Sequence, residues 1–331
     1  MTRAPVKALV TGGNGYLGTQ VIAALLGQGT EVRATARSLR SEPEIRDALR
    51  RAGADDERLE VVAADLTSDE GWAAATEGVE EVHHVASPIP PTQPEDPDEL
   101  IIPARDGTRR VLDAARRAGA RRVILTSSFA AVGYSPKPVR DYTEADWTDP
   151  DTPGLAPYPR SKAIAERAAW EFMDQHPGEI ELVVLNPTFI LGPSLVASLR
   201  SSLVAIKAIA EGTMPALPRQ RFGVVDVRDV ADAHVRAAAT PGAANRRYLL
   251  LADGPTTTWR GVAEAVRDHL GPAGAAVTVE EAPGEEPAPL TIHNERAKDE
   301  LGWRPRPALT TIGDTVDNLR DLGLLAIPPA S

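Results

Sequence analysis

The stretch Lys7-Ala8-Leu9-Val10-Thr11-Gly12-Gly13-Asn14-Gly15-Tyr16-Leu17-Gly18 decides the fold of this chain. Its first five residues form a short apolar run that is typical of a buried strand. Glycines follow at positions 12, 15 and 18, and residues 19–28 place apolar side chains at helical spacing. A second strand is expected at 31–35, so strand, glycine-rich turn, helix and strand occur within about thirty residues. This order predicts a dinucleotide-binding unit.

Each glycine of the turn has an expected role. Gly12 would allow the tight turn, and Gly15 would let backbone N–H groups approach a pyrophosphate at the helix N-terminus. Gly18 would let the helix pack close to the sheet. The same glycine pattern also occurs in ordinary loops, so the flanking strand and helix are what favour a nucleotide site.

The end of the second strand indicates which dinucleotide binds. No Asp or Glu lies between Val32 and Ser41, whereas Arg37 and Arg40 do. An acidic residue there would accept hydrogen bonds from the ribose hydroxyls of NAD, and an Arg would pair with the 2′-phosphate of NADP. The alternative is that both are solvated loop charges. The residue types favour NADP.

Strand and helix patterns keep alternating after this unit. Strands are expected at 59–64, 81–86, 122–127 and 181–185, with helices at 68–76, 98–118 and 158–175. This alternation predicts an α/β fold, a Rossmann doubly wound parallel sheet with a smaller C-terminal substrate lobe. Residues 1–193 would form mainly the NADP-binding domain and residues 194–331 mainly the lobe, with segments around 221–252 rejoining the sheet. In the lobe we expect a helix at 194–211 and an exposed linker at 271–290.

Polar residues at the predicted strand ends mark the ligand crevice. Asp65 could hydrogen-bond an adenine amino group, and Ala86 and Ser87 could line the adenosine side, because α/β sheets bind ligands at the carboxyl ends of their strands. His83 and His84 fall inside a strand. A buried pair is the preferred interpretation over metal ligation, since no third ligand is spaced nearby.

Tyr158-Pro159-Arg160-Ser161-Lys162 opens a helix and supplies a candidate catalytic pair. Residues four apart share a helix face, so the Tyr158 hydroxyl and the Lys162 ammonium would point the same way. A nearby ammonium favours phenolate and lowers the pKa of a phenol, which makes it a usable proton donor near neutral pH. A hydroxyl from the run Thr126-Ser127-Ser128, where the strand at 122–127 ends, would face the same crevice and orient a substrate carbonyl. The loops at 88–97 and 129–157 would border this pocket.

Composition excludes several classes of protein. The net charge of −11 argues against a nucleic-acid binder, which needs a basic face. The chain has no cysteine, which excludes disulfides, thiolate metal sites and Cys nucleophiles. No signal peptide and no apolar run of membrane-spanning length is evident, so a cytoplasmic location without membrane contact is expected.

Taken together, these motifs resemble the extended short-chain dehydrogenase/reductases. The nearest likeness is to the dihydroflavonol reductase and cinnamoyl-CoA reductase-like branch, which includes microbial aldehyde and ketone reductases. The resemblance spans most of the chain and is carried by Thr11–Gly18, Val32–Arg37, Asp65-Leu66, His84–Pro88, Pro103-Ala104, Gly107-Thr108, Thr126–Ser128, Tyr158–Trp170, Asn186-Pro187, Gly192-Pro193 and Val225–Ala231.

The resemblance implies a role for each matching position. Ser128, Tyr158 and Lys162 would be catalytic: Ser128 would orient the carbonyl, Tyr158 would donate the proton, and Lys162 would bind the nicotinamide ribose. The implied cofactor contacts are Gly12, Gly15, Tyr16, Leu17, Gly18, Arg37, Arg40, Asp65, Leu66, Val85, Ala86, Ser87, Tyr158, Lys162, Pro187, Thr188 and Ile190. No metal is implied.

Three departures limit what the resemblance implies. Ala104 stands where many short-chain dehydrogenases have Asn, as it does in the reductase branch, so any proton relay differs. Gly133 stands where the plant flavonoid enzymes have Asn, which argues against a flavonoid substrate. The segment around Tyr158 lacks the aromatic and Cys-containing pattern of the plant cinnamoyl-CoA enzymes, which argues against a cinnamoyl-CoA substrate.

The expected function is an NADPH-dependent carbonyl reductase acting on an aldehyde or ketone. One alternative is an NAD-dependent nucleotide-sugar epimerase or dehydratase, which shares the fold and the Tyr/Lys pair but would prefer NAD. Another is an NADP-binding sensor without catalysis, which would be free to lose Tyr158. The helices at 98–118 and 158–175 either cover the sheet or pair across a homodimer.

Overall fold

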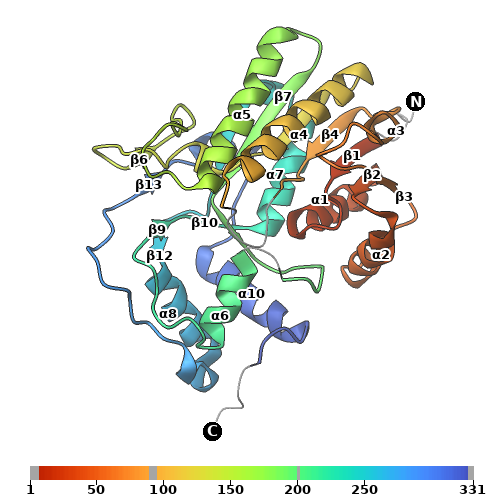
Figure 1. The fold of residues 1–331 in the computed structure, drawn as a ribbon. Helices are drawn as coiled ribbons and strands as arrows, with labels where there is room; N and C mark the ends of the chain where they lie inside the picture. The colour runs from red at the N-terminus through yellow and green to blue at the C-terminus, as the bar shows by residue number, and fades with distance from the viewer. Residues whose placement is uncertain (1–6, 89–94, 200–201, 327–331) are drawn as a thin grey trace.

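A parallel sheet of seven strands forms the centre of the computed structural model, which describes residues 7–88, 95–199 and 202–326 (Figure 1). Every neighbouring pair of strands is parallel. The predicted α/β fold with a Rossmann-like sheet is confirmed. In sheet order, the strands are β11 (Arg246–Leu250), β7 (Glu181–Pro187), β5 (Arg122–Thr126), β4 (Glu81–His84), β1 (Lys7–Thr11), β2 (Glu31–Ala36) and β3 (Leu59–Ala63).

Helices cover both faces of this sheet. The middle of strand β1 is apolar because both of its faces are covered. Leu9 packs into one apolar cluster, and Ala8 and Val10 pack into another on the opposite face. Because side chains alternate along a strand, a strand covered on both faces needs apolar residues at every position. One layer holds α3 (Trp72–Thr76), α4 (Asp98–Arg117) and α5 (Pro157–Gln175), and the other holds α1 (Tyr16–Gly27), α2 (Glu42–Arg51), α7 (Val227–Ala239) and α9 (Glu295–Leu301).

The strand order reverses direction between β1 and β4. The chain steps from β1 outward to β2 and β3, then returns to the other side of β1 and continues to β4, β5 and β7. In open parallel sheets, such a reversal opens a crevice at the carboxyl ends of the two strands. The glycine-rich turn after β1 and residues 85–87 after β4 lie on the two sides of this crevice.

A lobe of C-terminal elements packs below the sheet in the view of Figure 1. Its helices α6 (Ser202–Ala210), α8 (Trp259–Leu270) and α10 (Ala308–Asp321) share one apolar cluster. Two short strand pairs border it: β8 (Phe189–Leu191) with β10 (Val224–Asp226) in parallel, and β9 (Arg221–Phe222) with β12 (Thr257–Thr258) antiparallel. Of the segment at 221–252, only β11 therefore joins the large sheet.

Two predictions for the C-terminal half are wrong in part. Residues 194–199 are not helical, and the expected helix begins only at Ser202. The Ser194 hydroxyl donates to the Val196 carbonyl at 2.8 Å and accepts from its N–H at 3.2 Å, and such local bonds compete with helix formation. The segment 271–290 is not wholly an exposed linker, since Val277 and Leu290 are buried in it.

The segment 129–157 is more ordered than the predicted loop. It contains β6 (Asp141–Tyr142), which pairs in parallel with β13 (Thr291–Ile292). The Phe129 and Tyr142 rings meet edge to face at 5.5 Å, and they share a small apolar cluster with Leu249 of β11. This border of the crevice is therefore packed against the sheet edge. Residues 89–94 of the other predicted border lie outside the described residues.

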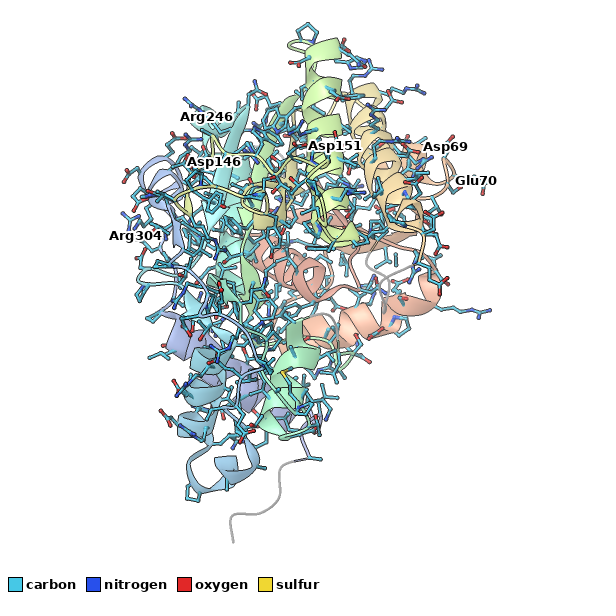
Figure 2. All side chains as sticks on the ribbon, turned by 60° about the vertical axis from the view of Figure 1, so that its left-hand side comes forward. Asp69, Glu70, Asp146, Asp151, Arg246 and Arg304 are labelled. Atoms are coloured by element: carbon cyan, nitrogen blue, oxygen red, sulfur yellow. The ribbon has the colours of Figure 1, made fainter. Side chains whose placement is uncertain are left out.

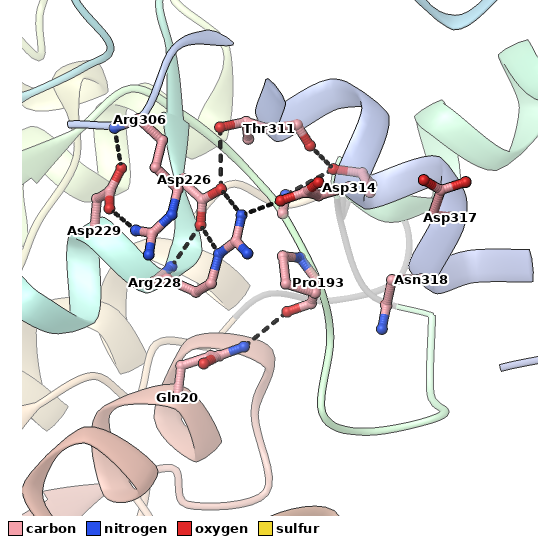
Figure 3. A network of polar contacts seen from close by, with 12 residues as sticks. Gln20, Pro193, Asp226, Arg228, Asp229, Arg306, Thr311, Asp314, Asp317 and Asn318 are labelled. Atoms are coloured by element: carbon pink, nitrogen blue, oxygen red, sulfur yellow. Dashed lines mark hydrogen bonds and ion pairs between the residues drawn. The ribbon is translucent and has the colours of Figure 1, made fainter. Parts of the chain in front are cut away.

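A polar network fastens α10 to the start of α7 (Figure 3). Asp226 Oδ1 caps α7 by accepting the Arg228 N–H at 2.8 Å, and Oδ2 accepts the Thr311 hydroxyl of α10 at 3.0 Å. The Arg228 guanidinium bridges Asp226, at 2.7 Å, and Asp314 of α10, at 2.5 Å. The Asp226 side chain is completely buried. The lobe is thus held in place by directed bonds as well as by apolar contact.

Charged side chains such as Asp69, Glu70 and Asp151 extend outward from the molecule (Figure 2). This arrangement lets water solvate much of the net charge of −11. No helix in the described ranges combines the length and the apolar character needed to cross a membrane.

Candidate active site

The turn after β1 has the geometry that its glycines predict. Gly12 has a φ of +71°, and a Cβ there would lie 3.1 Å from the Ala86 backbone. A Cβ on Gly18 would lie 2.2 Å from the Gly12 carbonyl oxygen, so any side chain would push α1 away from the turn. Helix α1 begins at Tyr16 with no acidic residue in its first turn and no side-chain cap from Gly15. Its first N–H groups are therefore suited to an anion such as a pyrophosphate.

The side chains of Tyr16 and Leu17, the first two residues of α1, are both held by contacts within the protein. The Leu17 side chain is buried in the apolar cluster beneath α1. The Tyr16 hydroxyl donates to the Gly192 carbonyl at 2.7 Å, and burial, followed by the nearby Asp226 charge, raises the pKa of Tyr16. Tyr16 thereby connects the glycine-rich turn to the segment that follows β8.

Arg37 and Arg40 are exposed just beyond the end of β2. Within the described residues, neither guanidinium takes part in a hydrogen bond or a close ion pair, so both are free to bind a phosphate. Asp65 follows the neighbouring strand β3. The backbone hydrogen bond from Thr67 is the main cause that lowers the pKa of Asp65, and the Arg37 charge contributes. Arg37 and Asp65 thus follow the paired strands β2 and β3, while Leu66 packs against Gly107 of α4.

Thr11 fixes the backbone at the end of β4. Its hydroxyl oxygen accepts the N–H groups of Val85, at 3.0 Å, and Ala86, at 2.9 Å. It also lies 2.9 Å from His84 Nδ1, and since it accepts twice, its own proton is available to that nitrogen. Burial, followed by the Lys162 charge, lowers the pKa of His84 to about 3. His84 is therefore a neutral buried residue, as predicted.

His83 is also buried, and its Nδ1 lies 3.3 Å from Nδ1 of His234 in α7. Among the residues the structure describes, no three His, Cys, Asp or Glu side chains gather as a metal site would require.

Ser128, Tyr158 and Lys162 converge at the carboxyl ends of the central strands. Ser128 follows β5, and Tyr158 and Lys162 lie one turn apart in the first turns of α5. The Ser128 side chain is near enough to Tyr158 to lower its pKa as a hydrogen-bond partner, and the Lys162 ammonium lies 6.0 Å from the centre of the Tyr158 ring. A hydroxyl, a phenol and an ammonium therefore lie in the same region of the site.

Burial dominates the acid–base properties of this pair. It raises the pKa of Tyr158, and the Ser128 hydrogen bond works in the opposite direction without cancelling it. The lowered Tyr158 pKa that we expect from Lys162 is therefore not reached in the protein alone. Burial also lowers the pKa of Lys162 to about 8, and the negative charge of Glu166 opposes that change.

The segment after β7 lies at the same edge of the sheet. Pro187 is the last residue of β7, and the Thr188 N–H donates to the Leu250 carbonyl of β11 at 3.0 Å. Ile190 lies in β8, paired with Val225. Thr188 and Ile190 are half-buried. The segment with the expected cofactor contacts Pro187, Thr188 and Ile190 is thus held to β11 at Thr188 and continues into the short strand β8, which pairs with β10.

Two further charged residues, Glu166 and Arg247, lie near the candidate catalytic residues Ser128, Tyr158 and Lys162. The buried Glu166 carboxylate of α5 pairs with Arg247 of β11 at 2.6 Å. Glu166 could have been found from the sequence, since it lies eight residues after Tyr158 and four after Lys162, on the same face of the helix. No sequence signal identifies Arg247, which is brought there only by the pairing of β11 with β7.

The fold and motifs can now be compared with known proteins. The model of the NAD dependent epimerase/dehydratase family matches residues 8–250. Cinnamoyl-CoA reductase 1 of Arabidopsis thaliana is 34% identical over 324 residues, which cover 96% of this chain and 90% of that protein. The structure of yeast methylglyoxal/isovaleraldehyde reductase Gre2 complexed with NADPH has a TM-score of 0.79 at 25% identity, covering 97% of this chain and all of that one.

Vestitone reductase from alfalfa (Medicago sativa) has a TM-score of 0.79 at 26% identity, covering 96% of this chain and 99% of that chain. The chain therefore belongs to the NAD-dependent epimerase/dehydratase family, the extended short-chain dehydrogenase/reductases, and within it to the branch of NAD(P)-dependent reductases that resemble cinnamoyl-CoA reductase and dihydroflavonol reductase.

Proposed function

We propose that this protein is an NADPH-dependent reductase of aldehydes or ketones, with Ser128, Tyr158 and Lys162 as its catalytic residues. The observation that carries the proposal is the convergence of these three side chains beside the crevice between β1 and β4. The relatives support it, since Gre2 is described as an aldehyde reductase complexed with NADPH. The substrate-binding lobe would be the part after residue 193.

The residues present fit NADPH. Gly12 and Gly18 allow the close packing of the turn and of α1, since a Cβ at either position would collide with backbone. The N-terminus of α1 that this turn presents has no side-chain cap, and a pyrophosphate would bind there. The free guanidinium of Arg37 would bind the 2′-phosphate, with Arg40 beside it. Asp65 and residues 85–87 would contact the adenosine, and Pro187, Thr188 and Ile190 would lie at the nicotinamide end.

Reduction would require a hydride and a proton at the carbonyl group. Bound NADPH would supply the hydride to the carbonyl carbon and leave as NADP⁺. Ser128 would hold the carbonyl oxygen, and the Tyr158 hydroxyl would donate its proton to that oxygen to give the alcohol. The Lys162 ammonium would bind the nicotinamide ribose and favour the phenolate that remains on Tyr158.

The direct test is NADPH oxidation with a panel of aldehydes and ketones. Tyr158→Phe removes the proton donor, and we expect it to lower kcat by at least about 100-fold while NADPH binding is retained. Tyr248→Phe is the matched control, because that hydroxyl instead donates to Glu300 of α9 at 2.8 Å. Unchanged turnover in Tyr158→Phe would refute the catalytic assignment. Purified protein that carries tightly bound NAD and shows no NADPH-dependent turnover would favour the epimerase alternative.

A further inference from the structure

Glu166 is a fully buried carboxylate directly behind the candidate catalytic pair. It lies one turn after Lys162 and two turns after Tyr158 on the same face of α5. Its side chain has no exposed surface. A buried charge is costly unless it is paired and hydrogen-bonded, so the carboxylate requires specific partners.

Both carboxylate oxygens of Glu166 accept hydrogen bonds. Oε1 accepts from Arg247 Nε at 2.6 Å, and Oε2 accepts from the Ser127 hydroxyl at 2.5 Å and from Asn186 Nδ2 at 2.7 Å. The same Asn186 nitrogen donates to the Ser128 carbonyl at 3.2 Å. The carboxylate therefore holds the backbone on both sides of Ser128 through two separate partners.

Arg247 is fixed independently of Glu166. Its Nη1 donates to the carbonyl oxygens of Glu144, at 2.7 Å, and Asp146, at 2.8 Å. Its guanidinium lies 3.8 Å from the centre of the Trp147 ring, within the range of a cation–π contact. Only 7% of its side chain is exposed. The position of the carboxylate is thus set by the edge strand β11.

Glu166 and Lys162 face the same small cavity. This cavity has a volume of about 20 Å³, enough for about one water molecule, and is also lined by His84, Thr108 and Ser127. The titratable groups around Lys162 are Tyr158 and Glu166 on its own helix and His84 on β4, which is neutral. Helix α4 contributes only uncharged residues to the cavity, and Arg247 of β11 lies beyond Glu166. Glu166 is therefore the nearby negative charge that opposes the loss of the Lys162 proton.

We propose that the buried Glu166–Arg247 pair positions the catalytic set: the carboxylate keeps Lys162 protonated and fixes the backbone of Ser128, and Arg247 holds the carboxylate and moderates its charge. This inference rests on the proposed function in that it takes Lys162 and Ser128 as active-site residues. Glu166 is a positioning residue, since it acts through Lys162, Ser127 and Asn186.

The decisive measurement is the pKa of Lys162 itself. The chain has five lysines, so protein labelled with ¹³C at lysine Cε gives few resonances, and Lys162→Arg identifies the one required. We expect Glu166→Gln to lower the Lys162 pKa by about one pH unit or more, since an opposite charge one turn away is removed. Arg247→Gln should raise it, because the carboxylate is then no longer neutralised. A purely structural role would not produce shifts of opposite sign.

Glu171→Gln is the matched control on the same helix, because Glu171 pairs at the surface with Arg109 and its side chain is 59% exposed. It should leave the Lys162 pKa unchanged. If a single variant fails to fold, the double variant Glu166→Gln/Arg247→Gln removes both buried charges together. Its Lys162 pKa should lie below that of the wild type, because the nearer of the two charges is the negative one. A wild-type value would overturn the proposal.

Activity provides a second readout. The alkaline limb of the kcat profile should move to lower pH in Glu166→Gln and to higher pH in Arg247→Gln, by the shifts seen in the NMR titration. The two proposals fail differently. Signed pKa shifts in a protein that reduces no carbonyl would refute the proposed function alone. An active enzyme whose Lys162 pKa does not respond to either variant would refute the positioning role alone.

Discussion

Replacing Asp226 with Ala should destabilise the protein by about 3 kcal/mol. The change removes the N-cap of α7, which costs about 1 kcal/mol. It also removes the buried hydrogen bond from Thr311, about 1 kcal/mol, and a charge-assisted bond from Arg228. The last contribution is about 1 kcal/mol rather than more, because the Arg228 side chain is 30% exposed and keeps its contact with Asp314.

Urea unfolding of wild type and variants measures this cost. Asp232→Ala is the matched control on the same helix, since its ion pair with Arg236 is about 40% exposed on both sides and should be worth less than about 0.5 kcal/mol. Asp226→Asn should fall between the two, because Asn caps helices as well as Asp but brings no charge. An Asp226→Ala variant within about 1 kcal/mol of the wild type would refute the reasoning.

The stability lost in Asp226→Ala should also be confined to α10 and the segments that it contacts. Thr315 of α10 accepts the Gly192 N–H at 2.7 Å, so α10 supports the segment that follows β8 as well as the start of α7. We expect amide hydrogen exchange in α10 to accelerate in Asp226→Ala before the central sheet is affected. Equal acceleration in β1 and α10 would indicate global unfolding and contradict a local role.

Two further predictions concern the site. Burial lowers the Lys162 pKa from 10.5 to about 8, so below pH 8 the charged ammonium destabilises the native state relative to the unfolded chain. Lys162→Met removes this charge and should stabilise the protein at pH 7 by about 3 kcal/mol. The stability difference between Lys162→Met and the wild type should shrink as pH rises from about 8 to about 10.5, because over that range the wild-type lysine is neutral in the native state and still charged in the unfolded state. A difference in urea unfolding that does not change with pH would contradict this prediction. Arg37→Ser should raise the KM for NADPH by about tenfold or more and leave that for NADH nearly unchanged, as steady-state kinetics would show; equal effects on both would exclude a 2′-phosphate contact.

Local pattern was sufficient to predict the central sheet. The apolar run at 8–10 reflects a strand covered on both faces, and the glycines at 12 and 18 reflect backbone contacts that exclude a Cβ. These features can be predicted because each leaves a local pattern in the sequence, an apolar run or a glycine spacing, even where its contacts are distant. The lobe depends instead on distant partners. Ser194 is an example, since its N–H donates to Asn318 of α10 at 2.8 Å in addition to its local bonds with Val196.

The candidate site likewise contains some residues that a local sequence pattern identifies and others that depend on distant partners. Tyr158 and Lys162 are visible because one helix carries both, and the parallel order of the strands brings Ser128 to them. Arg247 illustrates what sequence alone does not supply: it reaches Glu166 from a position 81 residues away, through the pairing of β11 with β7. In the printed sequence it is one of many arginines, and what distinguishes it is its buried ion pair with Glu166. If the buried Glu166 charge favours the protonated form of Lys162, as we propose, then Arg247, which holds that charge, influences the site from an edge strand that no catalytic motif includes.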